Sequence, residues 1–288
     1  MLTGVLAALL SLLFSGIAPL LYKKGLRSYG SVLEANFVRC LYSTPASLVL
    51  FLIVNPVFHI SSATAVFVVI IGFLTTMLAD TSLLRSIRLL GAGLAMALAY
   101  TSPVFMIPLT AVVGEQVTVL RGLGAVLVTG GVGMSLYARP PQPKARRDYV
   151  VGVLTALLAS VSYAVALTLA AIVYKGGITP VELTFYRNSL AALLLAPWAP
   201  KMKRHYLSRN AVLMAVGGVL GSVLAIYTYY LAMAYSGTML AITVPGAAPV
   251  LTILIAALVM KESLTKRQYA GALLAILGAL TASLGQVR

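Results

Sequence analysis

Two arginines within apolar segments are the residues of this sequence best suited to chemistry. Arg39 and Arg187 each lie eight residues after a predicted helix cap, which is about 12 Å along an α-helix. A guanidinium at that depth needs a partner or a wet cavity, because snorkelling relieves only part of its desolvation. One interpretation is a charge clamp that binds a carboxylate or phosphate in bidentate fashion. The other is a structural pair with a carboxylate or with helix-end carbonyls, and the sequence leaves both open.

The acidic residues divide into helix caps and one exception. Glu34 and Glu182 each follow a hydroxyl residue by three positions ahead of an apolar run, which predicts capping boxes at two helix starts. Asp80 lies inside an apolar segment and has no capping role. We favour an interfacial acid paired to Arg85 or Arg88. The alternative is a coupling group that exchanges a proton or binds an amine.

Hydroxyl and aromatic side chains in the apolar segments are a second kind of candidate. Tyrosine offers an apolar face with one hydroxyl group, which suits an amphipathic organic ligand. An aromatic belt at the membrane interface is the alternative reading. The candidates for a cavity wall are Tyr227, Tyr100, Thr101, Ser15 and Tyr163.

Two prolines occupy matched places in the two halves of the chain. Pro103 and Pro249 each interrupt an apolar segment. Proline frees a backbone carbonyl, and matched interruptions are typical of helix hinges near a site at the membrane midplane. Packing kinks without a functional role are the alternative. No spacing of residues predicts a metal site or a cofactor.

The composition shows what must position these residues. The chain has 288 residues, of which 60% are hydrophobic and 9% charged, and its mean hydropathy is +1.00. A soluble domain carries about 25% charged residues, so the sequence predicts a polytopic membrane protein. The net charge of +15 sits in short loops between apolar segments, where it orients a chain in the bilayer. We therefore expect no nucleic-acid partner, and the single cysteine excludes an internal disulfide.

Ten apolar segments account for nearly the whole chain, and we expect an all-α membrane protein with ten transmembrane helices. The longest loops are too short for a nucleotide-binding or catalytic domain, which argues against an ATP-driven pump and against an enzyme. The predicted segments are 2–22, 32–54, 64–84, 91–113, 119–138, 149–174, 181–199, 211–233, 238–259 and 268–286.

The two halves of the sequence are similar to each other. The run Gly4–Leu10 resembles Gly152–Leu158, and the arginines and prolines above recur at offsets of 148 and 146 residues. The predicted repeats are residues 1–143 and 144–288. Five segments is an odd number, so the second repeat is expected to be inverted relative to the first.

The loop charges predict the orientation. The loops after the first, third, fifth, seventh and ninth segments hold 16 Lys and Arg residues, and the opposite side holds 3. Basic loops remain cytoplasmic, so we expect both termini outside the cell membrane.

With these features the sequence resembles the drug/metabolite transporter superfamily, EamA type. The resemblance rests on the duplication, the paired arginines, Leu231–Ser236 before the ninth segment, and the similar segment endings Gly114–Thr118 and Lys261–Thr265. It implies a central cavity walled by helices 1, 3, 4, 6, 8 and 9, with helices 5 and 10 at the periphery. It also implies secondary transport, often export, of small metabolites such as amino acids. Many relatives have cytoplasmic termini, and the loop charges here predict the opposite.

The leading hypothesis is a secondary active transporter that exports a small organic metabolite by alternating access around a central cavity. The alternative is a passive channel or a lipid scramblase. The expected partners are a small-molecule substrate and the lipid bilayer, with the protein a monomer or homodimer.

Overall fold

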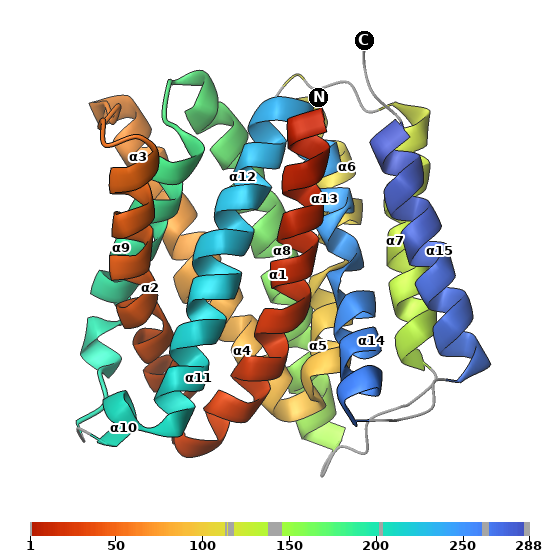
Figure 1. Cartoon of the computed structure of the whole chain (residues 1–288), viewed down its shortest axis with the longest axis horizontal. Helices are drawn as coiled ribbons and strands as arrows, with labels where there is room; N and C mark the ends of the chain where they lie inside the picture. Colours follow the sequence, from red (N-terminus) through yellow and green to blue (C-terminus); the bar gives the residue numbers. More distant parts are fainter. Residues whose placement is uncertain are drawn as a thin grey trace.

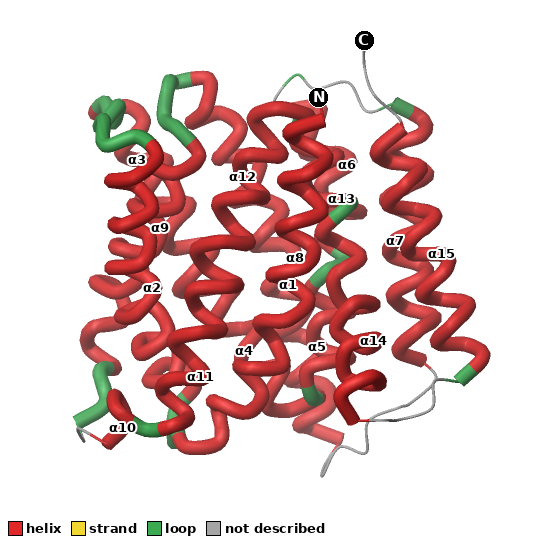
Figure 2. Tube along the Cα trace, in the orientation of Figure 1, coloured by secondary structure: helices red, strands yellow, loops and turns green. Residues whose placement is uncertain are grey.

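The computed structural model describes residues 2–112, 114, 118–137, 146–201, 204–260 and 265–284, and the regular elements of these residues are all helical (Figure 2). In Figure 1 the long helices run side by side, and the start of α1 and the end of α15 lie at the same end of the bundle. The helices of the first half are α1 (Leu2–Gly25), α2 (Val32–Val54), α3 (Ser62–Gly72), α4 (Thr81–Leu90), α5 (Ala92–Ala99), α6 (Ser102–Val112) and α7 (Val119–Tyr137). Those of the second half are α8 (Arg146–Lys175), α9 (Pro180–Leu195), α10 (Arg204–Leu207), α11 (Arg209–Gly218), α12 (Ala225–Ser236), α13 (Thr238–Thr243), α14 (Ala248–Met260) and α15 (Lys266–Leu284).

The helices present an apolar surface to the outside, as in a multi-pass membrane protein. Large side chains such as Ile53, Val66 and Leu193 are exposed, whereas Arg39 and Arg187 are buried. This is the reverse of the distribution in a soluble protein. Within the described residues, five continuous helical stretches are long and apolar enough to cross a membrane. They are Leu2–Ser28, Val32–Val54, Ser62–Leu90, Arg146–Lys175 and Arg209–Ser236.

The helix that begins with α3 is longer than the sequence predicted. It continues through a π-helical segment, η2 (Phe73–Asp80), into α4. Arg85 and Arg88 therefore lie on a helix and not in a loop, which corrects the expected boundary. Gly91 ends the helix with a φ of 83°. Glycine adopts this backbone conformation without steric cost, so the chain can turn there directly into α5.

A second π-helical segment, η4 (Val219–Leu224), separates α11 from α12 at the corresponding place in the second half. Each π segment adds a residue to a helical turn and so rotates the following side chains relative to a regular α-helix. In η2 the hydroxyl of Thr75 donates to the Ile71 carbonyl oxygen at 2.7 Å. A hydrogen bond from a threonine hydroxyl to the carbonyl oxygen four residues earlier bends a helix and competes with its backbone hydrogen bonds.

Both predicted capping boxes are confirmed, but the two glutamates differ in their other contacts. Glu34 accepts one hydrogen bond, from the Ser31 backbone N–H at 3.3 Å. Glu182 is fully buried and accepts from the Thr179 backbone N–H at 3.3 Å. It also accepts from the His59 backbone N–H at 2.7 Å and the Tyr186 hydroxyl at 2.9 Å, and its second oxygen lies 3.1 Å from His59 Nδ1. Glu182 thus ties the loop between α2 and α3 to the start of α9.

We expect Glu182→Ala to lower the free energy of unfolding by about 3 kcal/mol, because donors from three residues lose a buried, charged acceptor. Glu34→Ala is the matched control and is expected to cost about 1 kcal/mol, the usual value of one capping contact. Thermal unfolding of both variants in detergent measures the difference. Equal losses in the two variants would show that the contacts of Glu182 with the 55–61 loop add nothing.

The pair α7 and α15 packs closely at one side of the bundle, in agreement with the peripheral place that the resemblance implied (Figure 1). Glycines allow the close approach. A β-carbon at Gly131 would lie 2.5 Å from the Gly271 carbonyl oxygen and 2.5 Å from the Ala275 nitrogen. A β-carbon at the neighbouring Gly130 would meet no atom within 4 Å.

This difference predicts opposite effects from one chemical change. Gly131→Ala is expected to destabilise the protein by about 2 kcal/mol, since α7 and α15 must move apart. Gly130→Ala is expected to be neutral or slightly stabilising, since alanine favours the helix. Melting temperatures of the two purified variants provide the comparison, and a Gly131→Ala protein as stable as the wild type would refute the close packing.

Candidate functional site

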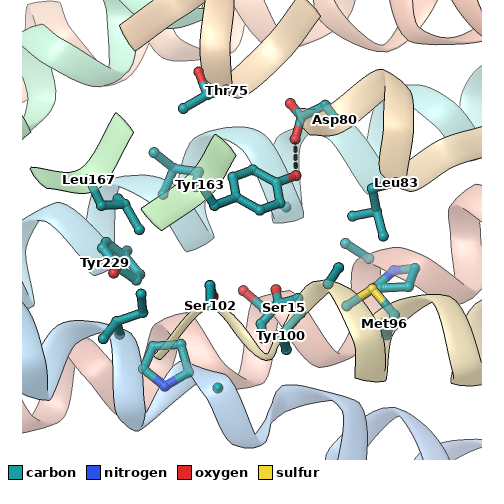
Figure 3. A pocket seen from close by; sticks show the side chains of 18 of the residues that line it. Ser15, Thr75, Asp80, Leu83, Met96, Tyr100, Ser102, Tyr163, Leu167 and Tyr229 are labelled. Atoms are coloured by element: carbon teal, nitrogen blue, oxygen red, sulfur yellow. Dashed lines mark hydrogen bonds between the residues drawn. The ribbon is translucent and has the colours of Figure 1, made fainter. Parts of the chain in front are cut away.

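A cavity of about 110 Å³ lies inside the bundle. One water occupies about 10–15 Å³ on this scale, so the cavity has room for several waters or one small organic molecule. Side chains from both halves of the chain form its wall (Figure 3). The residues that line it are Ser15, Ala18, Pro19, Tyr22, Arg39, Thr75, Asp80, Leu83, Met96, Ala99, Tyr100, Ser102, Tyr163, Leu167, Arg187, Gly221, Ile226, Tyr229, Tyr230, Ile242, Pro245 and Gly246.

The structure brings six of the sequence-predicted residues to this cavity. Three are the cavity candidates Ser15, Tyr100 and Tyr163, all labelled in Figure 3. The other three are the charged residues Arg39, Asp80 and Arg187. The two arginines add α2 and α9 to the helices that the resemblance implied as the wall.

Two other candidates do not line the cavity. Thr101 donates from its hydroxyl to the Leu98 carbonyl oxygen at 2.8 Å, and its oxygen lies 3.0 Å from the Ser160 hydroxyl. Tyr227, in α12, is half-buried and is not a lining residue, although its neighbours Ile226, Tyr229 and Tyr230 are.

The centre of the site is an ion cluster of three buried side chains. Asp80 Oδ2 lies 2.6 Å from Arg39 Nη2 and 3.1 Å from Arg187 Nη2. The Tyr163 hydroxyl donates a short hydrogen bond to the other carboxylate oxygen, Asp80 Oδ1, drawn as a dashed line in Figure 3. Asp80 therefore links η2 to α2, α8 and α9.

This cluster corrects the expected pairing of Asp80 with Arg85 or Arg88. Arg88 donates instead to the backbone oxygens of Gly30 at 2.9 Å and Tyr29 at 3.0 Å, and Arg85 is exposed. Asp80 is buried and faces the bundle interior, whereas Arg85, five residues further along the same helix, lies on a different face and is exposed.

Neutral polar groups fix the orientation of both guanidinium groups. Arg39 donates from Nε to Asn36 Oδ1 at 2.8 Å and from Nη1 to the Ser222 hydroxyl. Arg187 donates from Nε to Thr75 Oγ1 at 3.0 Å and from Nη1 to the Ser222 carbonyl oxygen at 3.3 Å. Thr75 lies in η2 and Ser222 in η4, so the two π-helical segments both contribute to the site.

Interrupted helices form another part of the wall. The segment expected at 91–113 divides into α5 and α6 at Tyr100 and Thr101, and Pro103 is the second residue of α6. The segment expected at 238–259 divides into α13 and α14 around a short 3-10 turn, Pro245–Ala247. Pro249 is the second residue of α14. Both prolines thus lie just after a break in the helix, and their role as hinges stays a prediction.

The tyrosines Tyr22, Tyr229 and Tyr230 were missed by sequence reasoning. The sequence has four aromatic or hydroxyl residues in a row, Tyr227 to Tyr230, and does not show which of them faces a cavity. The sequence alone did not show that Ile226, Tyr229 and Tyr230 are the residues of α12 that face the cavity. Tyr22 directly precedes Lys23, so the sequence indicated a position at the end of a helix and not in a cavity wall.

Comparisons with known proteins agree with this architecture. The sequence matches the EamA-like transporter family twice, over residues 2–137 and 150–284. It is 27% identical over 269 residues to an "Uncharacterized transporter" of Archaeoglobus fulgidus, across 93% of this chain and 92% of that protein. A solved structure described as "Crystal structure of protein" is similar with a TM-score of 0.75 and 20% identity, covering 98% of this chain and 96% of that one. At this identity the second likeness shows the fold alone.

Proposed function

Since this chain belongs to the EamA-like transporter family, within the drug/metabolite transporter superfamily, we propose that it is a secondary active transporter that exports small organic metabolites. Small organic metabolites such as amino acids and related carboxylates are the proposed substrate range. The observation that carries the proposal is the cavity, because both family-matched segments contribute to its wall. A binding site between two halves of a bundle with an apolar outer surface is what alternating access requires.

The proposed architecture is ten transmembrane helices in two inverted repeats. The placement of η2 and η4 supports it, since each π-helical segment lies at the same point of its half of the chain. The helix breaks before Pro103 and Pro249 support it in the same way. Rocking of one repeat against the other around the cavity would then expose the site to each side in turn.

The proposed orientation places the basic end of the bundle in the cytoplasm and both termini outside. In Figure 1 the end of α1, which carries Lys23 and Lys24, lies at the same end as the start of α11. The start of α1 and the end of α15 lie at the opposite end. The excess of Lys and Arg in loops at one end supports the assignment.

Substrate uptake by purified protein in liposomes tests the function, with two tyrosine variants as a matched pair. Tyr100→Ala is expected to lower the uptake rate about ten-fold, as for loss of an aromatic contact worth about 1.4 kcal/mol. Tyr227→Ala removes the same atoms outside the cavity and is expected to leave uptake unchanged. Equal loss in both variants, or no loss in Tyr100→Ala, would show that transport does not pass through this cavity.

A further inference from the structure

The cavity wall carries an unbalanced charge. Arg39 and Arg187 are both cationic, since guanidinium stays protonated in proteins, and Asp80 is the one carboxylate between them. The three side chains are 4%, 2% and 8% exposed. Among the described residues that line the cavity there is no other charged side chain. The ion cluster therefore leaves one positive charge at the cavity.

An unbalanced charge at this depth is costly. A buried ion pair offsets its desolvation only when charges and hydrogen bonds are matched, and a lone cation inside a membrane protein is unfavourable. Structural pairing would be complete with one arginine and Asp80. A structural ion pair needs only one of the two guanidinium groups. The second can therefore bind a further anion in the cavity.

Arg187 has N–H groups available to bind that anion. It carries five N–H groups, and three of them donate, to Thr75, to the Ser222 carbonyl oxygen and to Asp80. Within the part of the chain that the structure describes, one N–H on each terminal nitrogen has no acceptor. Arg39 is more fully used, since its terminal nitrogens donate to Ser222, Asp80 and the Cys40 sulfur.

We propose, building on the transport function above, that the cavity binds a small organic anion with one net negative charge. Its carboxylate lies against Arg187 beside Asp80, and its apolar body lies among the tyrosines Tyr100, Tyr163 and Tyr229. The charge of the bound compound then neutralises the ion cluster. The tyrosine faces favour an apolar body over a strongly hydrated one.

The same geometry disfavours cations and zwitterions. An ammonium group would need a carboxylate, and Asp80 already contacts two guanidinium groups and the Tyr163 hydroxyl. A cation would also add to the positive charge of the cluster. A zwitterion satisfies Arg187 with its carboxylate but leaves its ammonium group with only hydroxyl and carbonyl oxygens, so it is expected to bind less tightly than the anion.

A series of compounds built on one branched apolar chain tests this selectivity. Thermal stability of the detergent-purified protein is measured with 4-methylpentanoate, its amide, leucine and 3-methylbutylamine, since a ligand that binds only the folded state raises its stability. We expect the carboxylate to bind about ten-fold more tightly than leucine, and the amide and amine to give no shift. Preference for leucine or the amine would overturn the anion proposal.

Variants and simple salts complete the test. Arg187→Gln leaves a balanced pair of Arg39 and Asp80, so we expect it to fold and to bind 4-methylpentanoate at least about ten-fold more weakly. Arg85→Gln removes an equal charge at an exposed position and is expected to bind as the wild type. If chloride or sulfate alone gives the same shift as the carboxylate at equal concentration, the site is one for inorganic anions and the organic part of the proposal fails.

The binding data separate this inference from the proposed transport function. Liposomes loaded with leucine or with 4-methylpentanoate report transport directly. Saturable transport of leucine with no response to the carboxylate would overturn the anion selectivity and leave the transport function intact. Tight carboxylate binding without transport of either compound would overturn the transport function and retain the site.

Discussion

Asp80→Ala is expected to lower the free energy of unfolding by about 3–5 kcal/mol, the cost of breaking a buried ion pair by removing one partner. The alanine variant leaves Arg39 and Arg187 buried near each other without a counter-ion. The Tyr163 hydroxyl loses its acceptor as well. Thermal unfolding in detergent and the yield of monodisperse protein measure the loss.

Two further variants show whether charge balance is the cause. Asp80→Asn combined with Arg187→Gln removes one charge of each sign, and we expect it to recover a large part of the stability lost in Asp80→Asn alone. Such non-additivity is the signature of residues in one network. Asp148→Ala, in the first turn of α8, is the control and is expected to cost less than about 1 kcal/mol. Wild-type stability in Asp80→Ala would contradict the ion cluster.

Ala99→Leu is expected to lower transport by about ten-fold or more, a binding cost of about 1.4 kcal/mol, because the larger side chain occupies part of the cavity that the substrate needs. Ala99 is fully buried and lines the cavity, so leucine adds three carbon atoms where substrate must lie. The initial rate of uptake into liposomes is the measurement. The variant is expected to remain folded, since the added volume is taken from an existing cavity.

The same substitution on the outer surface provides the control. Ala234 is an exposed residue of α12 and does not line the cavity. Ala234→Leu is expected to keep the wild-type uptake rate. An Ala99→Leu protein that transports normally would show that substrate bypasses the cavity, as a scramblase with a lipid-facing groove would allow.

Much of the helical architecture follows from local sequence patterns. Ser31 with Glu34, and Thr179 with Glu182, predicted the starts of α2 and α9 because capping depends on residues three positions apart. The depth of Arg39 and Arg187 predicted that each needs a partner, because charge within an apolar segment is costly. These inferences use only near neighbours or the period of one helix.

The identity of the partner could not be predicted in this way. Asp80 lies 41 residues from Arg39 and 107 from Arg187, so their contact depends on the packing of three separate helices. The sequence paired Asp80 with Arg85 because they are near each other along the chain, but Asp80 is buried and Arg85 is exposed on the same helix. The choice of Tyr227 over Tyr229 and Tyr230 failed for a similar reason, because the three lie close together in the sequence and the packing of α12 decides which of them lines the cavity.

Counterflow in proteoliposomes tests the central claim most directly. Vesicles loaded with an excess of one unlabelled candidate substrate receive a trace of the same labelled compound outside. An alternating-access transporter is expected to accumulate the label transiently above its external concentration, with a rate that saturates as substrate rises and falls strongly in Ala99→Leu. Flux that rises linearly with concentration, shows no counterflow and is unchanged in Ala99→Leu would contradict the account and identify a passive pathway.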